Sequence, residues 1–367
     1  DENADAQTQA ELWQFIEDKF SRSFIIPPDR DAFRNRGETF WDVLTRAAEQ
    51  EDAARWLKRF VLRQQPKRAI DFADQLDMKI KQELTGFAKI SWQHTLSWGE
   101  RSCWREYART FIGESLHAIP LLEKTAAVLI RLSHPQGIDE REESGFVGHP
   151  AETRLYRIIG VTYNSLGYAR VQSGQFDQAV QDYAAALRYL RQAHFEAQTA
   201  ITGNNLARAL SELGHTTRAV RVCLDALDIR ERMGAEFPIA YSHTTLALIY
   251  NNGLRPEDVW PEAALAVAYF RRLQNARGLG LSLLQFGESL RRLSTSGKTL
   301  ADNPLELQDA AEQILQEGLG IFTDPNNLAS HETIRRIEAH IELGCLFRDR
   351  ARPKLTPDFA RRERRNR

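Results

Sequence analysis

Few places in this sequence carry residues whose types and spacing could support catalysis or metal binding. Ser296-Gly297-Lys298-Thr299 has the form of the last residues of a phosphate-binding loop, but Arg292 stands where such a loop needs its first glycine. That loop also follows a strand, and the pattern around this segment is helical. His331 and His340 are nine residues apart, whereas two zinc-binding histidines on one helix are usually four apart. We therefore interpret the first segment as a loop between helices and the histidines as solvent-facing residues.

The cysteines and the main acidic run give no reactive cluster either. Cys103, Cys223 and Cys345 are far apart, with no CxxC pair and no Cys/His cluster, so neither a disulfide framework nor a zinc site is indicated. A reducing, cytoplasmic setting is the simpler interpretation. The acidic run 139–143 is expected to be solvated. Since no nucleophile, base and orienting group come together, we expect no enzyme activity, no cofactor and no bound metal.

Length and charge set the broad class of the protein. Its 367 residues suffice for two or three domains or for one elongated array. Lys and Arg number 49 against 50 Asp and Glu, so charge gives no general attraction to nucleic acid or to an anionic membrane. The sequence shows no apolar run long enough to span a membrane and no signal peptide. Because the first residue is Asp1, we expect a processed product or a piece of a longer protein.

An internal repeat of about 40 residues organises the second half of the chain. One apolar position recurs at this interval, followed each time by glycine or alanine: Leu166, Leu206, Leu246 and Phe286. Twenty residues later the register holds again, at Ala186–Leu187, Ala226–Leu227 and Ala266–Val267. Such a period predicts a stack of similar structural units.

Each unit has the pattern of two helices joined by a tight turn. In the first unit, Tyr163, Leu166 and Gly167 lie three or four residues apart on one helical face. Gly174 then ends this helix, since glycine takes the left-handed conformation without a Cβ penalty. A second helix is predicted over 177–192, and small residues such as Gly167 let the two helices approach closely.

These features resemble the tetratricopeptide repeat (TPR). The matching pattern is aromatic, Leu-Gly, Gly-aromatic, Ala, aromatic, Ala, at Tyr163, Leu166, Gly167, Gly174, Phe176, Ala179, Tyr183 and Ala186. The second unit, with 204–207 and 223–231, is similar to the longer TPRs of kinesin light chains and of sensor arms in STAND-type ATPases. The resemblance covers about 152–349 and implies an all-α fold, an α-solenoid of about five helix pairs.

The repeats depart from the TPR pattern at four places. Arg170 stands in a slot that is usually aromatic, and Thr216 replaces another aromatic residue. In the third unit, residues 251–256 predict a turn that is shifted by one residue. The period breaks at 293–304, which we expect to be an insertion. Two more helices are then predicted, over 305–322 and 334–350.

The first 133 residues form a different, Trp-rich unit. Six of the seven tryptophans lie before residue 105. Apolar stripes of helical period recur there, at Leu12/Phe15/Ile16, Phe40/Val43/Leu44/Ala47, Trp56/Leu57/Phe60/Val61 and Ala69/Phe72/Ala73/Leu76/Ile80. We expect a helical cap or adaptor over 1–133, with no family resemblance. Residues 134–151 are predicted to be a loop or boundary, and 350–367 a basic tail.

The concave face of a curved array is the predicted binding site. The first helix of each unit lines it, and the candidate groove residues are Asn164, Tyr168, Asn204, Asn205, Arg208, Thr244, Asn251, Gln285, Glu288 and Arg291. An asparagine amide both donates to and accepts from a peptide backbone. The resemblance implies that Asn164 and Asn204 hold an extended peptide in this way. Arg208 and Arg291 suit an acidic side chain or a terminal carboxylate.

Our first hypothesis is a non-catalytic interaction scaffold that binds a peptide or protein segment in this groove, with no membrane or nucleic-acid partner and with self-association allowed. The alternative is the sensing portion of a larger signalling protein, whose ATPase, protease or DNA-binding part is absent from this chain. A cryptic enzyme in the Trp-rich part is a third hypothesis. A nucleic-acid-binding solenoid is the fourth, and it needs a basic stripe that the mixed charges of Arg208, Glu212, Glu288 and Arg291 do not supply.

Overall fold

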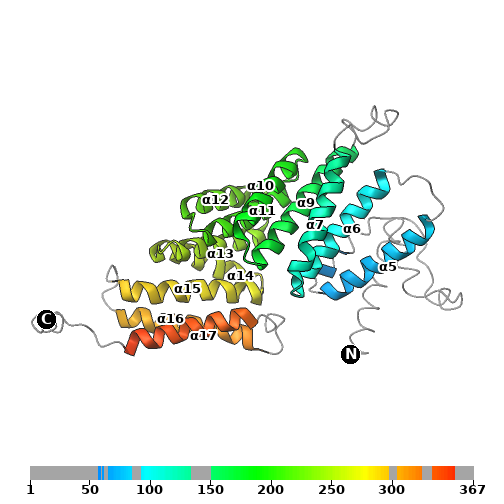
Figure 1. Cartoon of the computed structure of the whole chain (residues 1–367). Helices are drawn as coiled ribbons and strands as arrows, with labels where there is room; N and C mark the ends of the chain where they lie inside the picture. Colours follow the sequence, from blue (N-terminus) through cyan, green and yellow to red (C-terminus); the bar gives the residue numbers. More distant parts are fainter. Residues whose placement is uncertain are drawn as a thin grey trace, which may run out of the picture. The chain divides into compact units, whose positions relative to one another are not determined.

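The computed structural model describes residues 57–58, 60–61, 65–84, 92–133, 150–296, 304–324 and 333–351 (Figure 1). The regular secondary structure of these ranges is α-helical throughout, which confirms the predicted fold class. By its contacts the chain divides into two compact units, residues 1–143 (unit 1) and 144–367 (unit 2). The apolar stripes before residue 56, His331, most of the 134–151 segment and the tail from residue 352 lie outside the described residues.

Three long helices form the described part of unit 1: α5 (Pro66–Leu84), α6 (Trp92–Phe111) and α7 (Ser115–Leu132). Helix α6 packs against both others. The predicted apolar stripe of α5 is buried at Ala69, Phe72, Ala73 and Leu76. Gly99 brings α6 close to α7, because a Cβ there would lie 2.6 Å from Leu129 Cδ2. Helical periodicity alone therefore located the buried face of α5 correctly.

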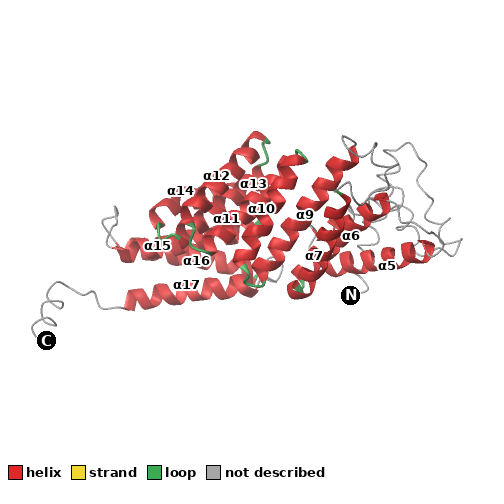
Figure 2. Ribbon diagram, turned by 45° about the horizontal axis from the view of Figure 1, so that its top comes forward, coloured by secondary structure: helices red, strands yellow, loops and turns green. Residues whose placement is uncertain are grey.

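Unit 2 is a run of helix pairs. The first helices of the pairs are α9 (Pro150–Gln172), α11 (Glu196–Glu212), α13 (Glu236–Asn252), α15 (Ala276–Ser296) and α17 (Thr333–Ala351). The second helices are α10 (Phe176–Gln192), α12 (Thr216–Arg232), α14 (Pro256–Arg272) and α16 (Pro304–Thr323). The helices lie roughly side by side in chain order (Figure 2).

The spacing of the helices gives unit 2 an inner and an outer side. Helices α9, α11, α13 and α15 each pack against their own second helix. Helices α11, α13, α15 and α17 each pack against the second helix of the preceding pair. Successive first helices also contact one another, whereas successive second helices make far fewer contacts. Because one edge of the stack is drawn together and the other is spread, the first helices line the inner face of the curve, as a solenoid requires.

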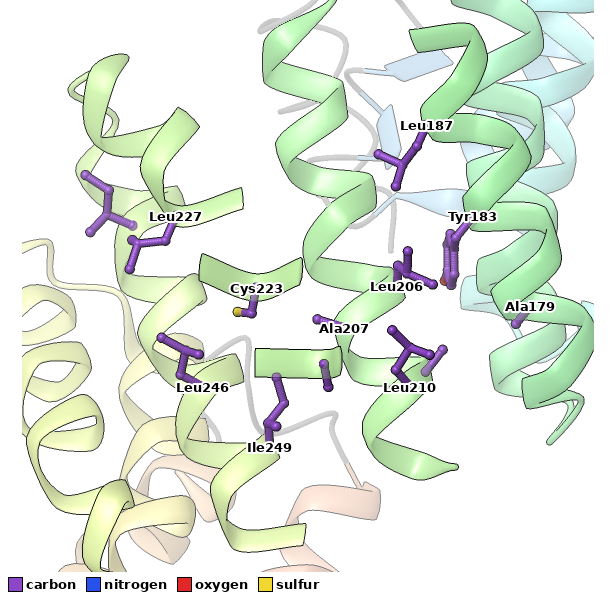
Figure 3. Close-up of a cluster of buried hydrophobic side chains, with 13 residues drawn as sticks. Ala179, Tyr183, Leu187, Leu206, Ala207, Leu210, Cys223, Leu227, Leu246 and Ile249 are labelled. Atoms are coloured by element: carbon purple, nitrogen blue, oxygen red, sulfur yellow. The ribbon is translucent and has the colours of Figure 1, made fainter. Parts of the chain in front are cut away.

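We call the contact between the two helices of one pair the apolar seam. Small residues of the first helix lie against large residues of the second: a Cβ at Gly167 would fall 2.8 Å from the Tyr183 ring, and one at Gly287 would fall 2.5 Å from Leu315. Side chains from four successive helices, α10 to α13, continue this packing from one pair to the next (Figure 3). The 40-residue pattern of small and large residues is thus the pattern of this seam.

The turn of the third pair corrects one expectation. The left-handed residue is Gly174 in the first pair and Gly214 in the second, and in the third it is Leu254, with φ of 55°, in the same register. The turn is therefore not shifted by one residue. Gly253 serves another purpose, because a Cβ at this position would lie 2.6 Å from Thr216 Cγ2.

Two other departures from the repeat also have a structural account. Helix α15 continues to Ser296, so the helix extends into the segment expected to be an insertion, and α16 begins at Pro304. Arg170, in the slot that is usually aromatic, donates from Nη1 to Asp182 Oδ2 of α10 at 2.6 Å. A largely buried ion pair thus stands where an aromatic ring would pack.

Candidate functional site

Side-chain hydrogen bonds join each first helix to the next, and we call this set of bonds the polar ladder. Between α9 and α11, Asn164 Oδ1 accepts from Thr202 Oγ1 and from Asn205 Nδ2, both at 3.1 Å. Between α11 and α13, Asn204 Nδ2 donates to Thr245 Oγ1 at 2.8 Å. These bonds link residues about 40 positions apart, so they follow the repeat.

The ladder continues from α13 to α15. Asn251 Nδ2 donates to the backbone oxygen of Gln285 at 2.9 Å and to its Oε1 at 3.0 Å. The hydroxyls of Thr244 and Ser282 lie 2.8 Å apart, within hydrogen-bond distance. Asn251 Oδ1 is buried and has no hydrogen-bond partner among the described residues.

Ion pairs form the last rung, between α15 and α17. Arg291 Nε donates to Glu342 Oε2 at 2.8 Å, and its Nη1 donates to Asp349 Oδ2 at 3.0 Å. Burial lowers the pKa of Arg291, but the two carboxylates outweigh burial and raise the pKa overall. Arg291 is thus engaged by α17 rather than directed at a ligand.

The ladder explains where the predicted groove residues lie. Four of them are buried: Asn164, Asn204, Thr244 and Asn251. The expectation that these four side chains stand open to a groove is not met, because each faces the neighbouring first helix. Asn204 is bonded at both ends of its amide, since its Oδ1 also accepts from Cys223 Sγ at 3.5 Å. Asn164 Nδ2 has no hydrogen-bond partner among the described residues and is the one buried-asparagine donor left over.

The other candidates are partly exposed: Tyr168, Asn205, Arg208, Gln285, Glu288 and Arg291. Arg208, on α11, forms no hydrogen bond or ion pair with any residue that the structure describes, which sets it apart from Arg291. Glu288 pairs with Arg292 one turn later on α15. Burial raises the pKa of Glu288, and the arginines beside it oppose this effect.

Sequence analysis missed a second column of residues on the same face. One partly exposed apolar position recurs on successive first helices at the 40-residue interval: Val161, Ile201, Tyr241 and Leu281. Ile201 precedes Arg208 by seven residues, or two helical turns, so both project from the same side of α11. The 40-residue register was the available signal, but the candidate groove residues were chosen mainly among polar and charged types.

The described residues offer little chemistry of a catalytic kind. Burial raises the pKa of the Cys223 thiol to about 12, so this sulfur is not a thiolate near neutral pH. No group of three or more potential metal ligands occurs in the described part of the chain. In unit 1, Arg105 donates to Glu106, Asp77 and Asp74, so these carboxylates are charge-compensated. None of the described helices is long and apolar enough to cross a membrane.

Comparisons with known proteins agree with this geometry. The family model for the tetratricopeptide repeat matches residues 199–233, which span α11, its turn and α12. No curated protein matches the sequence. Among solved structures, the chain is similar to a STAND protein with a tetratricopeptide repeat sensor from Pyrococcus horikoshii. The two share 14% identity and a TM-score of 0.55, over 84% of this chain and 43% of that one.

Two further structures show weaker similarity. BtubC (BKLC) from P. vanneervenii has 16% identity and a TM-score of 0.47, over 70% of this chain and 90% of its own. The apo form of RapI has 12% identity and a TM-score of 0.49, over 81% and 96% respectively. Identities this low compare folds alone. The helix arrangement of unit 2 is an α-solenoid of tetratricopeptide-like helix pairs, and residues 199–233 match the family model of the tetratricopeptide repeat.

Proposed function

We propose that this protein is a non-catalytic interaction scaffold that binds an extended, acidic peptide segment along the inner face of unit 2. The observation that carries the proposal is Arg208, a partly exposed guanidinium on a first helix with no partner among the described residues. Most other arginines of the first helices are already engaged, as Arg170 and Arg291 are. An arginine left unpaired beside an apolar column is equipped to bind a carboxylate.

The neighbours of Arg208 suit the rest of such a peptide. Asn205, partly exposed on α11, donates from Nδ2 to Asn164, and its Oδ1 can accept from a peptide N–H. Ile201, which is 40% exposed, offers an apolar contact two turns from Arg208. The expected ligand therefore combines a backbone in extended form, one apolar side chain and an acidic group, either internal or at a carboxyl terminus.

A displayed library of random 12-residue peptides, selected on the full chain, tests this proposal, with calorimetry on the enriched sequences. Arg208→Ala should weaken binding roughly 10- to 100-fold, the value of a charge-assisted hydrogen bond. Arg221→Ala, on the exposed face of α12, is the matched control and should leave binding unchanged. Peptides that bind Arg208→Ala as tightly as the parent chain would show that the inner face is not the site.

A second candidate function is the sensing portion of a larger signalling protein. The match to the Pyrococcus horikoshii STAND protein favours it, since that protein has a tetratricopeptide repeat sensor and the match spans 43% of its length. The two proposals share the binding face and differ in the consequence of binding. The length of the native open reading frame separates them, because a sensor requires an effector domain on the same chain. The buried cysteines Cys103 and Cys223 suit a reducing, cytoplasmic compartment in either case.

A further inference from the structure

Among the residues that the structure describes, α17 is a first helix without a second helix of its own. It contacts α16, the second helix before it, and α15, the first helix before it. Helices α11, α13 and α15 make the same two kinds of contact with the pair that precedes each of them. Its buried residues fit the same register: Ala339, Leu343 and Leu346 correspond to Thr202, Leu206 and Ala209 of α11. The other four first helices each carry a second helix of their own, and among the described residues none packs on α17 in this way.

The face of α17 that would meet a second helix is open. In the other pairs two positions seven residues apart lie in the apolar seam, and in α9 they are Gly160 and Gly167, which contact Leu190 and Tyr183. The same positions in α17 are Ile337 and Gly344. Ile337 is 52% exposed, and no atom lies within 4 Å of a Cβ built at Gly344.

The open face carries exposed apolar side chains, together with His340 and Arg348. Ile341 is 56% exposed and Phe347 is 48% exposed, on the same side of the helix as Ile337 and Gly344. The residues equivalent to Ile337 in the second and third pairs, Ala200 and Ala240, are at most 1% exposed. Exposed apolar side chains aligned on one face of a helix mark an interaction surface.

We propose that a second copy of this chain covers this face, with α17 of each copy serving as the missing second helix of the other. The two helices of a pair run antiparallel, so the helix that covers α17 must place a large residue against Gly344. Seven residues later it must place a small residue against Ile337. An antiparallel copy of α17 meets both requirements, because its own Ile337 then faces Gly344 and its own Gly344 faces Ile337.

This pairing is an isologous, two-fold interface, in which the same patch of both copies is self-complementary. In this register His340 of each copy faces Ile341 of the other, on either side of the two-fold axis. Residues 352–367 fit less well: they contain seven Lys or Arg and only three apolar residues apart from proline, Leu355, Phe359 and Ala360. A stretch of that composition lacks the apolar stripe of a second helix.

The size of the interface sets the expected affinity. A helix of 19 residues is about 28 Å long, and a single helix pair lies at the low end of stable protein interfaces. We therefore expect a dimer with a dissociation constant on the order of 10 μM, in the range of weak, transient assemblies.

Sedimentation equilibrium of the full chain between about 1 and 200 μM tests the proposal, with three variants. Gly344→Leu sets a large residue against Ile337 of the other copy and should weaken the dimer roughly 10- to 100-fold by overpacking. Because no atom lies near the Gly344 Cβ position, this change leaves the single copy undisturbed. Gly320→Leu is the matched control, at a helical glycine of α16 that is equally open, and should leave the dimer intact.

The double variant Ile337→Ala/Gly344→Leu exchanges the large and small positions and should restore association to within a few fold of the parent chain. A parent chain that stays monomeric up to about 200 μM would overturn the proposal. So would a dimer that persists in Gly344→Leu, or a double variant no tighter than Gly344→Leu alone. The peptide-binding proposal does not depend on these results, since Arg208 lies on α11.

Discussion

The two faces of each first helix in unit 2 carry different kinds of side chain. The apolar seam toward the second helix is dry, with glycine or alanine opposite Leu, Tyr or Phe. The polar ladder toward the next first helix consists of Asn, Thr, Ser and Arg side chains bonded to one another. Apolar burial is non-directional, whereas hydrogen bonds require a defined geometry. The seam therefore supplies most of the stability, and the ladder fixes how one pair is set against the next.

Removing a large residue from the seam should have the largest effect. Phe270 of α14 is fully buried, and its ring is so close to α15 that a Cβ at Gly278 would lie 2.3 Å from it. Phe270→Ala should lower the free energy of unfolding by about 3–5 kcal/mol, through lost burial and the cavity left behind. Urea unfolding measures this, with Trp260→Ala, an exposed residue of the same helix, as a control that changes stability by less than about 1 kcal/mol.

Arg230 is a charged residue within the apolar seam, and its replacement by an apolar residue should raise the free energy of unfolding rather than lower it. It occupies the register of Leu190 and Phe270, is 5% exposed, and donates to Pro238 O and Ser242 Oγ rather than to a carboxylate. Burial lowers its pKa to about 10. Since the folded state holds this proton less tightly, the charge destabilises the fold near neutral pH, and Arg230→Leu should raise the unfolding free energy by about 2 kcal/mol.

The pH dependence checks that explanation. The penalty is complete below the folded pKa and decreases as pH rises from about 10 toward the higher pKa of an arginine in the unfolded chain. Melting temperatures of the parent and of Arg230→Leu should therefore differ most near pH 8 and less near pH 10.5. A parent chain that is more stable than Arg230→Leu at pH 8 would mean that the carbonyl and hydroxyl contacts of Arg230 outweigh its desolvation.

A single rung of the ladder should have the smallest effect. Asn204→Ala removes the bonds to Thr245 and Cys223 and should cost about 1 kcal/mol, the net value of a buried hydrogen bond. Gln172→Ala, at an exposed position of α9 outside the polar ladder, is the control. A loss as large as that of Phe270→Ala would mean that the ladder, too, holds the pairs together.

The sequence predicted the seam well and the ladder poorly. Leu166 and the small residue after it, Gly167, recur by type at fixed spacing, and burial of such residues follows from their hydrophobicity and size. Asn164 and Asn204 also stand 40 residues apart. A polar residue at such an interval is equally compatible with a solvent-exposed groove and with a hydrogen bond to the next first helix. Distinguishing the two requires the distance between successive first helices, which no local pattern contains. The left-handed Leu254 was missed for a similar reason, because Gly253 next to it is kept for its contact with Thr216.

The polar ladder also has a mechanical consequence. The apolar seams resist compression and separation, so each helix pair should move as a rigid body. Neighbouring helix pairs are joined on their inner edge by the hydrogen bonds of the polar ladder, which can lengthen or exchange partners when the pairs move slightly. On their outer edge the pairs are spread apart. Unit 2 should therefore bend elastically about its inner edge. A ligand lying across several first helices would stiffen that edge, and the change in curvature would be carried to both ends of the array.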